Sequence, residues 1–284
     1  MFATLLGGLP RPPLPDDAAP GSLVDAAIAA QVEAGLGPLG DGGWWGSVPP
    51  LEAWTATTDR TDRPVKQAVV GPVTTGGGIA DARALNDVLR SLAAAGCPLI
   101  EIHEPALAGI GDDPDAWRLV REAHAAMTDG VAGAHLSLAV TGGAIDPAGF
   151  EAVLAAPFAS YALDLIAGPE NWRFVRAVPG ERGIVCGAMA VDPVADEGPE
   201  ILLWAAAYAA SSQGRGRDRV GLSTASSLAA LRWDVAVRRL ARLGAAVELA
   251  SGSLDELREG LDPRSIDART AALGHGAPPP RRGP

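Results

Sequence analysis

The sequence predicts an α/β protein that folds as a single (β/α)8 barrel, the TIM barrel. Short apolar segments of strand length alternate with segments whose apolar residues recur at helical spacing, and this pair occurs eight times. The length of 284 residues suits one such barrel. We expect the barrel to span residues 1–274 and the tail at 275–284, rich in proline and arginine, to be disordered.

The alternation assigns each strand and helix to a range. The expected strands are residues 2–6, 35–39, 66–70, 98–102, 134–139, 160–166, 183–186 and 219–222. The expected helices are residues 22–34, 80–95, 114–128, 147–155, 169–178, 199–211 and 226–243. Proline in the first turn costs no helical hydrogen bond, so Asp113-Pro114 and Asp146-Pro147 indicate helix starts.

Three segments depart from this alternation. Residues 41–64 hold three tryptophans and scattered charges without a helical period, which predicts a long loop at the active end of the barrel. Near the C-terminus we expect a strand end at residues 246–249 and a helix at residues 254–259.

Composition and charge favour a small-molecule partner. The 34 acidic side chains outnumber 23 basic ones, and a net charge of −11 repels nucleic acid. No apolar stretch approaches the roughly 18 residues that predict a membrane span. Cys97 and Cys186 are too few for a disulfide framework and lack CxxC spacing. We therefore expect a cytoplasmic protein with neither nucleic acid nor membrane as partner, and leave open whether it forms a homodimer.

In such a barrel the active site lies at the carboxyl ends of the strands, so the residues there are the candidates. The candidate catalytic residues are His103, His135, Glu104 and Asp164. The candidate substrate-binding residues are Gly7, Gly8, Asp41, Trp44, Trp45, Ser137, Cys186, Ser223 and Thr224. We expect the two tryptophans to cover a flat ligand by stacking.

Some of these residues also have a purely structural interpretation. Each candidate histidine could instead be hydrogen-bonded inside the barrel, although two together favour a site. Cys186, within Val-Cys-Gly, is more typical of a buried core residue than of a nucleophile. We interpret His124, in the middle of a predicted helix, and His275, in the tail, as solvated residues.

Four motifs occur in an order that resembles the C-terminal barrel of cobalamin-independent methionine synthases. They are LLGGLP at residues 5–10, VVGPVT at 69–74, IEIHEPAL at 100–107 and HLS at 135–137. The resemblance spans nearly the whole chain and extends to the uroporphyrinogen decarboxylase-like methyltransferases. It implies the (β/α)8 fold and methyl-transfer chemistry.

The resemblance also implies a zinc ion held by a histidine, two cysteines and a glutamate, because zinc keeps the acceptor thiol as a thiolate. His135 matches the histidine, but Ser137 and Thr224 fall where the cysteines are expected, and Asp164 falls at the glutamate. Serine and threonine are poor zinc ligands. We therefore expect no zinc, and a substrate other than homocysteine.

These features predict a zinc-independent methyltransferase-like enzyme rather than standard methionine synthesis. It would act on a heteroaromatic or pterin-like donor or acceptor, with a folate-like methyl carrier left open. His135 or His103 would shuttle the proton, Asp164 would orient that histidine, and Glu104 would bond a ring nitrogen. The alternatives are a metal-free decarboxylase or lyase, which would need arginines at the mouth, and a non-catalytic barrel that binds such a ligand.

Overall fold

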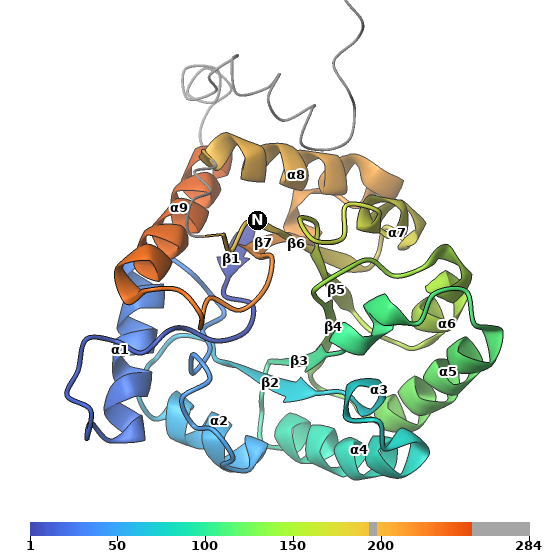
Figure 1. The fold of residues 1–284 in the computed structure, drawn as a ribbon, viewed down its shortest axis with the longest axis horizontal. Helices are drawn as coiled ribbons and strands as arrows, with labels where there is room; N and C mark the ends of the chain where they lie inside the picture. The colour runs from blue at the N-terminus through green and yellow to red at the C-terminus, as the bar shows by residue number, and fades with distance from the viewer. Residues whose placement is uncertain (193–197, 252–284) are drawn as a thin grey trace, which may run out of the picture.

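A parallel sheet of seven strands forms the centre of the computed structural model, which describes residues 1–192 and 198–251. The strand order is β1-β7-β6-β5-β4-β3-β2. The strands are β1 (Phe2–Thr4), β2 (Lys66–Val70), β3 (Leu99–His103), β4 (His135–Val140), β5 (Ser160–Asp164), β6 (Gly183–Met189) and β7 (Val220–Thr224). The sheet curls around an axis, with helices outside it (Figure 1). The predicted parallel α/β architecture is confirmed.

Helices follow the strands in the expected alternation. They are α1 (Pro20–Glu33), α2 (Pro50–Thr58), α3 (Pro72–Thr75), α4 (Gly78–Ala94), α5 (Pro114–Thr128), α6 (Phe150–Ala155), α7 (Asn171–Ala177), α8 (Pro199–Ser211) and α9 (Trp233–Ser251). Short 3-10 helices lie at Pro105–Gly109, Pro147–Gly149, Ser212–Gly214 and Arg217–Arg219. Proline starts α5 as predicted, where the Asp113 carboxylate accepts hydrogen bonds from two backbone N–H groups.

The second predicted strand, residues 35–39, is not a strand. Gly37 N–H donates to the Ala3 carbonyl at 2.8 Å, and Leu39 forms one isolated parallel bridge with Val65. The chain then turns through Gly42 and Gly43, whose positive φ values are unfavourable for other residues. Seven strands and one bridge therefore take the place of the eight predicted strands.

Three further expectations about secondary structure are wrong. The predicted loop at residues 41–64 contains α2, which the core stabilises because the buried Trp54 indole donates to the Val65 carbonyl at 3.1 Å. The helix expected from residue 226 begins at Trp233, and the strand end expected at residues 246–249 lies within α9. The helix expected at residues 254–259 and the tail at 275–284 lie outside the described residues.

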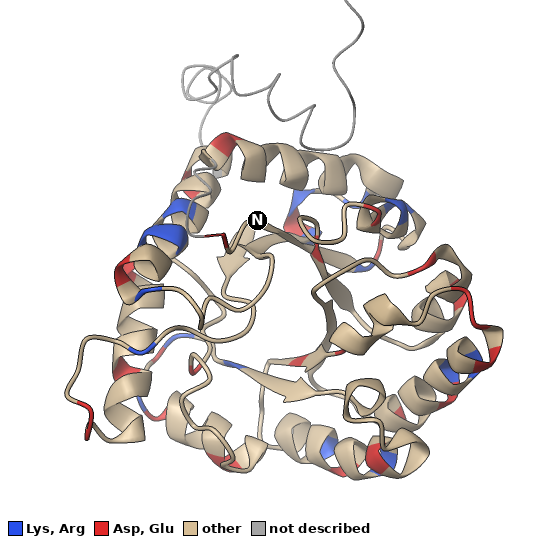
Figure 2. Cartoon of the chain, in the orientation of Figure 1, with Lys and Arg blue, Asp and Glu red and all other residues tan. Residues whose placement is uncertain are grey.

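Successive strand residues alternate between the axis of the curled sheet and the surrounding helices. Most large apolar side chains face the helices and form the main core. Toward the axis, Leu6, Ala139, Ala162 and Val185 form a separate small cluster against Phe2. Figure 2 shows that charged residues lie mainly on the outer helices and loops. Within the described part of the chain, no helix has the length and apolar character that a membrane crossing requires.

Candidate active site

Strand register places the two predicted catalytic histidines at opposite ends of the sheet. His103 is the last residue of β3 and pairs with Ala139, whereas His135 is the first residue of β4 and pairs with Leu99. Four residues of strand, about 13 Å at 3.3 Å per residue, separate the two levels. The expectation that both histidines face one mouth is therefore wrong, and only His103 lies at the carboxyl end.

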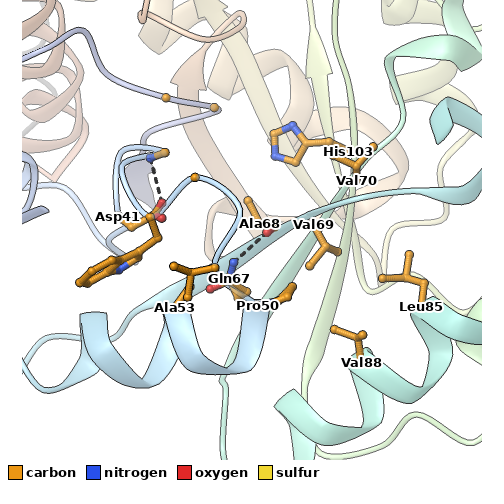
Figure 3. Close-up of a pocket in the computed structure, with 16 residues that line it drawn as sticks. Asp41, Pro50, Ala53, Gln67, Ala68, Val69, Val70, Leu85, Val88 and His103 are labelled. Carbon is orange, nitrogen blue, oxygen red and sulfur yellow. Dashed lines mark hydrogen bonds between the residues drawn. The ribbon is translucent and has the colours of Figure 1, made fainter. Parts of the chain in front are cut away.

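A cavity of about 480 Å³ opens beside His103 at that end (Figure 3). Five predicted site residues line it, namely Gly7, Gly8, Asp41, Trp45 and His103. Most of the remaining lining is apolar and comes from β2, α2 and α4: Ala68, Val69, Val70, Pro50, Ala53, Leu85 and Val88. A cavity of this size, apolar with a few polar groups, is typical of a small-molecule site. We call it the mouth cavity.

The mouth cavity reaches around the edge of β2. Ala68 and Val70 on one face of this strand and Gln67 and Val69 on the other all line it. This is possible because the neighbouring segment pairs with β2 only up to Lys66, whose N–H donates to the Leu39 carbonyl at 2.8 Å. In Figure 3 His103 lies on one side of β2, and Leu85 and Val88 of α4 lie on the other.

A chain of three ionisable side chains leads from the mouth cavity into the interior. His103 Nε2 lies 2.7 Å from Glu101 Oε1, and Lys66 Nζ donates to Glu101 Oε2 at 2.6 Å. Lys66 Nζ also donates to the Leu5 carbonyl at 2.6 Å. Lys66 and Glu101 are buried, whereas the His103 side chain is 19% exposed. Only the histidine end of this chain can therefore reach a ligand.

Glu101 is ionised under ordinary conditions. Burial raises its pKa, but the charge of Lys66 and the hydrogen bonds from His103 and Lys66 outweigh burial and lower the pKa to about 2. An ionised carboxylate only accepts hydrogen bonds, so His103 Nε2 must carry a hydrogen. Nδ1 of His103 makes no hydrogen bond within residues 1–192 and 198–251. It is the nitrogen available to take or give a proton.

Glu104 has a structural role instead of the predicted contact with a ring nitrogen. Its carboxylate is buried and accepts from Val73 N–H at 3.0 Å and Thr74 N–H at 2.7 Å at the start of α3. A Cβ at Gly71 would overlap this carboxylate, so glycine is required there. The Gly-Pro-Val-Thr and Glu-Pro-Ala-Leu motifs therefore hold two loops together.

Asp164 also stabilises loops and does not orient either histidine. Its carboxylate accepts three backbone hydrogen bonds, from Gly142 at 3.0 Å, Ile166 at 3.0 Å and Ala167 at 2.8 Å. These bonds fix the loops after β4 and β5. The carboxylate is thereby committed to the backbone, and its catalytic role stays a prediction.

Four predicted binding residues lie away from the mouth cavity. Cys186 is buried under α8, and burial raises the pKa of its thiol to about 12, which makes it an inert core residue. The Ser223 hydroxyl donates to the Thr224 carbonyl, and the Thr224 hydroxyl bonds the backbone of Leu6. Trp44 packs against α1 and Leu39.

The remaining predicted residues form a second chain inside the sheet. Ser160 Oγ donates to Ser137 Oγ at 2.9 Å, and His135 Nε2 lies 2.8 Å from Ser160 Oγ. His124, interpreted from sequence as solvated, is instead buried, with its ring edge-on to Phe158. Its Nε2 lies 3.7 Å from Glu104 Oε1, beside the loop that Glu104 holds.

The residues that the resemblance assigns to zinc do not fit a zinc ion. His135 begins its strand, while Asp164 and Thr224 end theirs, so the three lie at different ends of the sheet. Ser137 and Thr224 offer neutral hydroxyls rather than thiolates. In the described ranges no group of three His, Cys, Asp or Glu side chains lies close enough to hold a metal.

Sequence reasoning missed Lys66 and Glu101. Glu101 stands two residues before His103 in a strand, so both side chains face the same side of the sheet. Lys66 is the only lysine of the chain and opens a strand whose last three residues are apolar. A buried lysine needs an anionic partner, and these signals together could have suggested one.

Comparison with known proteins identifies the fold. No protein-family model and no curated protein matches this sequence. Among solved structures, a B12-independent methionine synthase from a Shewanella species, in complex with selenomethionine, matches with a TM-score of 0.73 and 15% identity. The match covers 90% of this chain and 98% of that one.

Two further solved structures agree with this match. A Listeria monocytogenes protein assigned as a vitamin-B12 independent methionine synthase gives a TM-score of 0.68 at 13% identity, over 89% of this chain and 98% of that one. A methyltransferase from Methanosarcina mazei matches with a TM-score of 0.50 and 14% identity, and the match covers 71% of this chain and 64% of that one. The chain thus has the fold of cobalamin-independent methionine synthases, as the resemblance predicted, and the likeness is one of fold alone.

Proposed function

We propose that this chain is a methyltransferase-like enzyme that works without zinc on a small heteroaromatic or pterin-like molecule bound in the mouth cavity. The observation that carries the proposal is the hydrogen bond between His103 and Glu101 at the inner wall of that cavity. A carboxylate behind an imidazole orients the ring and stabilises the charge that the ring acquires when it takes a proton.

In this proposal each residue of the chain has a separate task. Methyl transfer requires an acceptor to lose a proton, or a donor nitrogen to gain one, as the methyl group moves in line. Nδ1 of His103 exchanges that proton. Glu101 holds the ring through Nε2, and Lys66 keeps Glu101 ionised. Trp45 stacks on the flat ligand, and Asp41 bonds a polar group on its edge.

The decarboxylase alternative has less support. Such an enzyme polarises its substrate through arginines, and none of the described residues that line the mouth cavity is an arginine. The glycines at positions 43 and 46 instead leave space for a flat ring to approach the backbone.

The test is transfer of a labelled methyl group from a methylated pterin to a panel of thiol and nitrogen-heterocycle acceptors. His103→Gln should lower the rate by about 10²- to 10⁴-fold, the usual contribution of a general acid or base. Arg90→Gln, on the exposed face of α4, is the control and should not change it. Full activity of His103→Gln would refute the assignment.

Metal analysis of the purified protein tests the second part of the proposal. We expect less than stoichiometric zinc and a rate that chelators do not change. Stoichiometric zinc lost together with activity would return the chain to metal-dependent thiol methylation. Ligand binding without turnover for any donor and acceptor would favour a non-catalytic barrel.

A further inference from the structure

A second cavity, which the proposed function does not use, lies at the opposite end of the sheet. Its volume of about 750 Å³ exceeds that of the mouth cavity. Its lining comes from residues that begin strands, including Phe2, Leu99, His135, Ser160 and Gly183. It therefore opens at the amino end of the strands, and we call it the amino-end cavity.

Buried side chains separate the two cavities. The apolar cluster of Leu6, Ala139, Ala162 and Val185 fills part of the axis, and Val185 also lines the amino-end cavity. The buried Lys66–Glu101 ion pair occupies the axis on the side of β2 and β3. The amino-end cavity and the mouth cavity share no lining residue and are thus separate.

The inner wall of the amino-end cavity offers a hydrogen-bond acceptor. Ser160 Oγ donates to Ser137, so it accepts from His135 Nε2, and His135 Nδ1 keeps a free lone pair. The residue as a whole is exposed, yet partial burial of the ring lowers the pKa of His135. The ring is therefore neutral near pH 7 and suited to accept from an N–H group of a ligand.

The rim carries a cation on one side and two anions on the other. Arg63 precedes β2, whereas Glu181 precedes β6 and Asp218 precedes β7. Arg219 also lines the cavity beside Asp218, and its guanidinium donates to the Arg215 carbonyl at 3.3 Å. β2 and β6 lie across the curled sheet from each other (Figure 1). The side chains of Arg63, Glu181 and Asp218 are exposed and have no ion pair or hydrogen bond with any residue that the structure describes. Both signs of charge are available to a ligand.

Between these charges the walls are apolar. Phe2, Leu99 and Ile184 contribute apolar side chains, and the prolines at positions 38, 64 and 98 add rigid flat surfaces. Such walls gain free energy by covering apolar groups of a ligand. The net charge of −11 opposes anions at long range but has little effect on a ligand of zero net charge.

We propose that the amino-end cavity binds a small zwitterion whose opposite charges lie at its two ends, with an N–H donor and apolar groups between them. A short apolar peptide has this chemistry. Its carboxylate pairs with Arg63, its ammonium group pairs with Glu181 and Asp218, and its amide N–H donates to His135 Nδ1. Its side chains cover Phe2 and the prolines.

Isothermal titration calorimetry of the full chain with leucyl-phenylalanine tests this proposal. We expect saturable binding with one site per chain. The N-acetylated and the C-amidated dipeptides each lack one terminal charge and should bind at least fivefold more weakly. Arg63→Gln should weaken binding of the unmodified dipeptide by a similar factor. It should also remove the difference in affinity between the unmodified and the C-amidated dipeptide. Arg63 is exposed, so this variant should fold.

Two control variants locate the bound peptide. Arg90→Gln removes an exposed arginine outside the cavity, and His103→Gln changes a side chain that lines the mouth cavity and not the amino-end cavity. Neither should change the affinity for the dipeptide. No detectable binding with the dipeptide at about 5 mM would overturn the proposal, because even a weak specific ligand binds at that concentration. An unchanged affinity of Arg63→Gln for the dipeptide would also overturn it. A loss of affinity in His103→Gln would overturn it too, because it would place the peptide in the mouth cavity. None of these results depends on whether the methyl-transfer assay succeeds.

Discussion

The two histidines at the ends of the sheet have the same side chain and different partners. His103 bonds a carboxylate whose charge is balanced by a buried lysine, whereas His135 bonds a serine hydroxyl. A carboxylate supports an imidazole that gains and loses a proton, and a hydroxyl does not. The partner of each histidine, more than the presence of histidine at a strand end, therefore decides which of them can act in proton transfer.

Breaking the His103–Glu101–Lys66 chain should cost more free energy of unfolding than breaking the His135–Ser160–Ser137 chain. Lys66→Met leaves Glu101 buried without its counter-ion, and we expect a loss of about 3–5 kcal/mol in the free energy of unfolding. Urea denaturation measures it. Adding Glu101→Leu should restore much of the loss, because the double variant buries no isolated charge. A loss below about 1 kcal/mol in the single variant would mean that the ion pair is well solvated.

Acid should destabilise the folded protein more through the His103–Glu101–Lys66 chain than through the hydroxyl chain, although at a lower pH. The pKa of Glu101 is about 2 in the folded protein against the ordinary value of 4.5, so the ionised form is stabilised by folding. That stabilisation, on the order of 3 kcal/mol, is complete above pH 4.5 and is lost as the pH falls toward 2.

The comparison of wild type with Glu101→Gln isolates this effect. The difference between their free energies of unfolding should be largest at neutral pH and should narrow below pH 4.5. A difference that stays constant between neutral pH and pH 3 would contradict the lowered pKa.

Replacing a mouth carboxylate whose hydrogen bonds come from the backbone should lower the free energy of unfolding less than breaking the Glu101 ion pair. Glu104→Gln keeps the shape of the side chain but places an amide NH2 against one of the two N–H groups of α3, at a cost of about 1–2 kcal/mol. Asp113→Asn, at the exposed start of α5, is the matched control, and we expect a smaller loss there. Equal losses in thermal denaturation of the two variants would show that burial of Glu104 adds nothing.

We expect the smallest change in stability from His135. Partial burial lowers its pKa, so the protonated form is disfavoured in the folded state and the free energy of unfolding declines as the pH falls below the ordinary value of 6.5. His135→Gln should remove this slight decline. Titration of the ring protons by NMR gives the value directly, and a midpoint at or above 6.5 would contradict partial burial of the ring.

The strands and helices were largely predictable because each carries its own periodicity. The exception, residues 35–39, is apolar like a strand but has Pro38 and two glycines, and forms a β-bridge at Leu39 alone. Helix α2 was missed because its three threonines and short length hide the helical period. These outcomes depend on neighbouring segments, which local patterns do not contain.

The site was less predictable for two physical reasons. His135 lies near the start of its predicted strand, so chain direction places it at the amino end, but it was counted among the residues at the carboxyl ends of the strands. Glu104 and Asp164 are polar residues at the correct strand ends, and only the position of loop N–H groups shows that their carboxylates are already occupied. The pairing of Lys66 with Glu101 depends on the approach of two side chains from neighbouring strands.

The single bridge at Leu39 also affects where the folded molecule opens locally. Strands β3 to β6 are paired along both edges, whereas the link between β1 and β2 consists of the few hydrogen bonds around Gly37, Leu39 and Lys66. Local opening follows the weakest set of bonds, so amide hydrogens there should exchange with solvent before those of the central strands. Such fluctuations would widen a lateral entrance beside β2 while the opposite wall of the sheet stays intact.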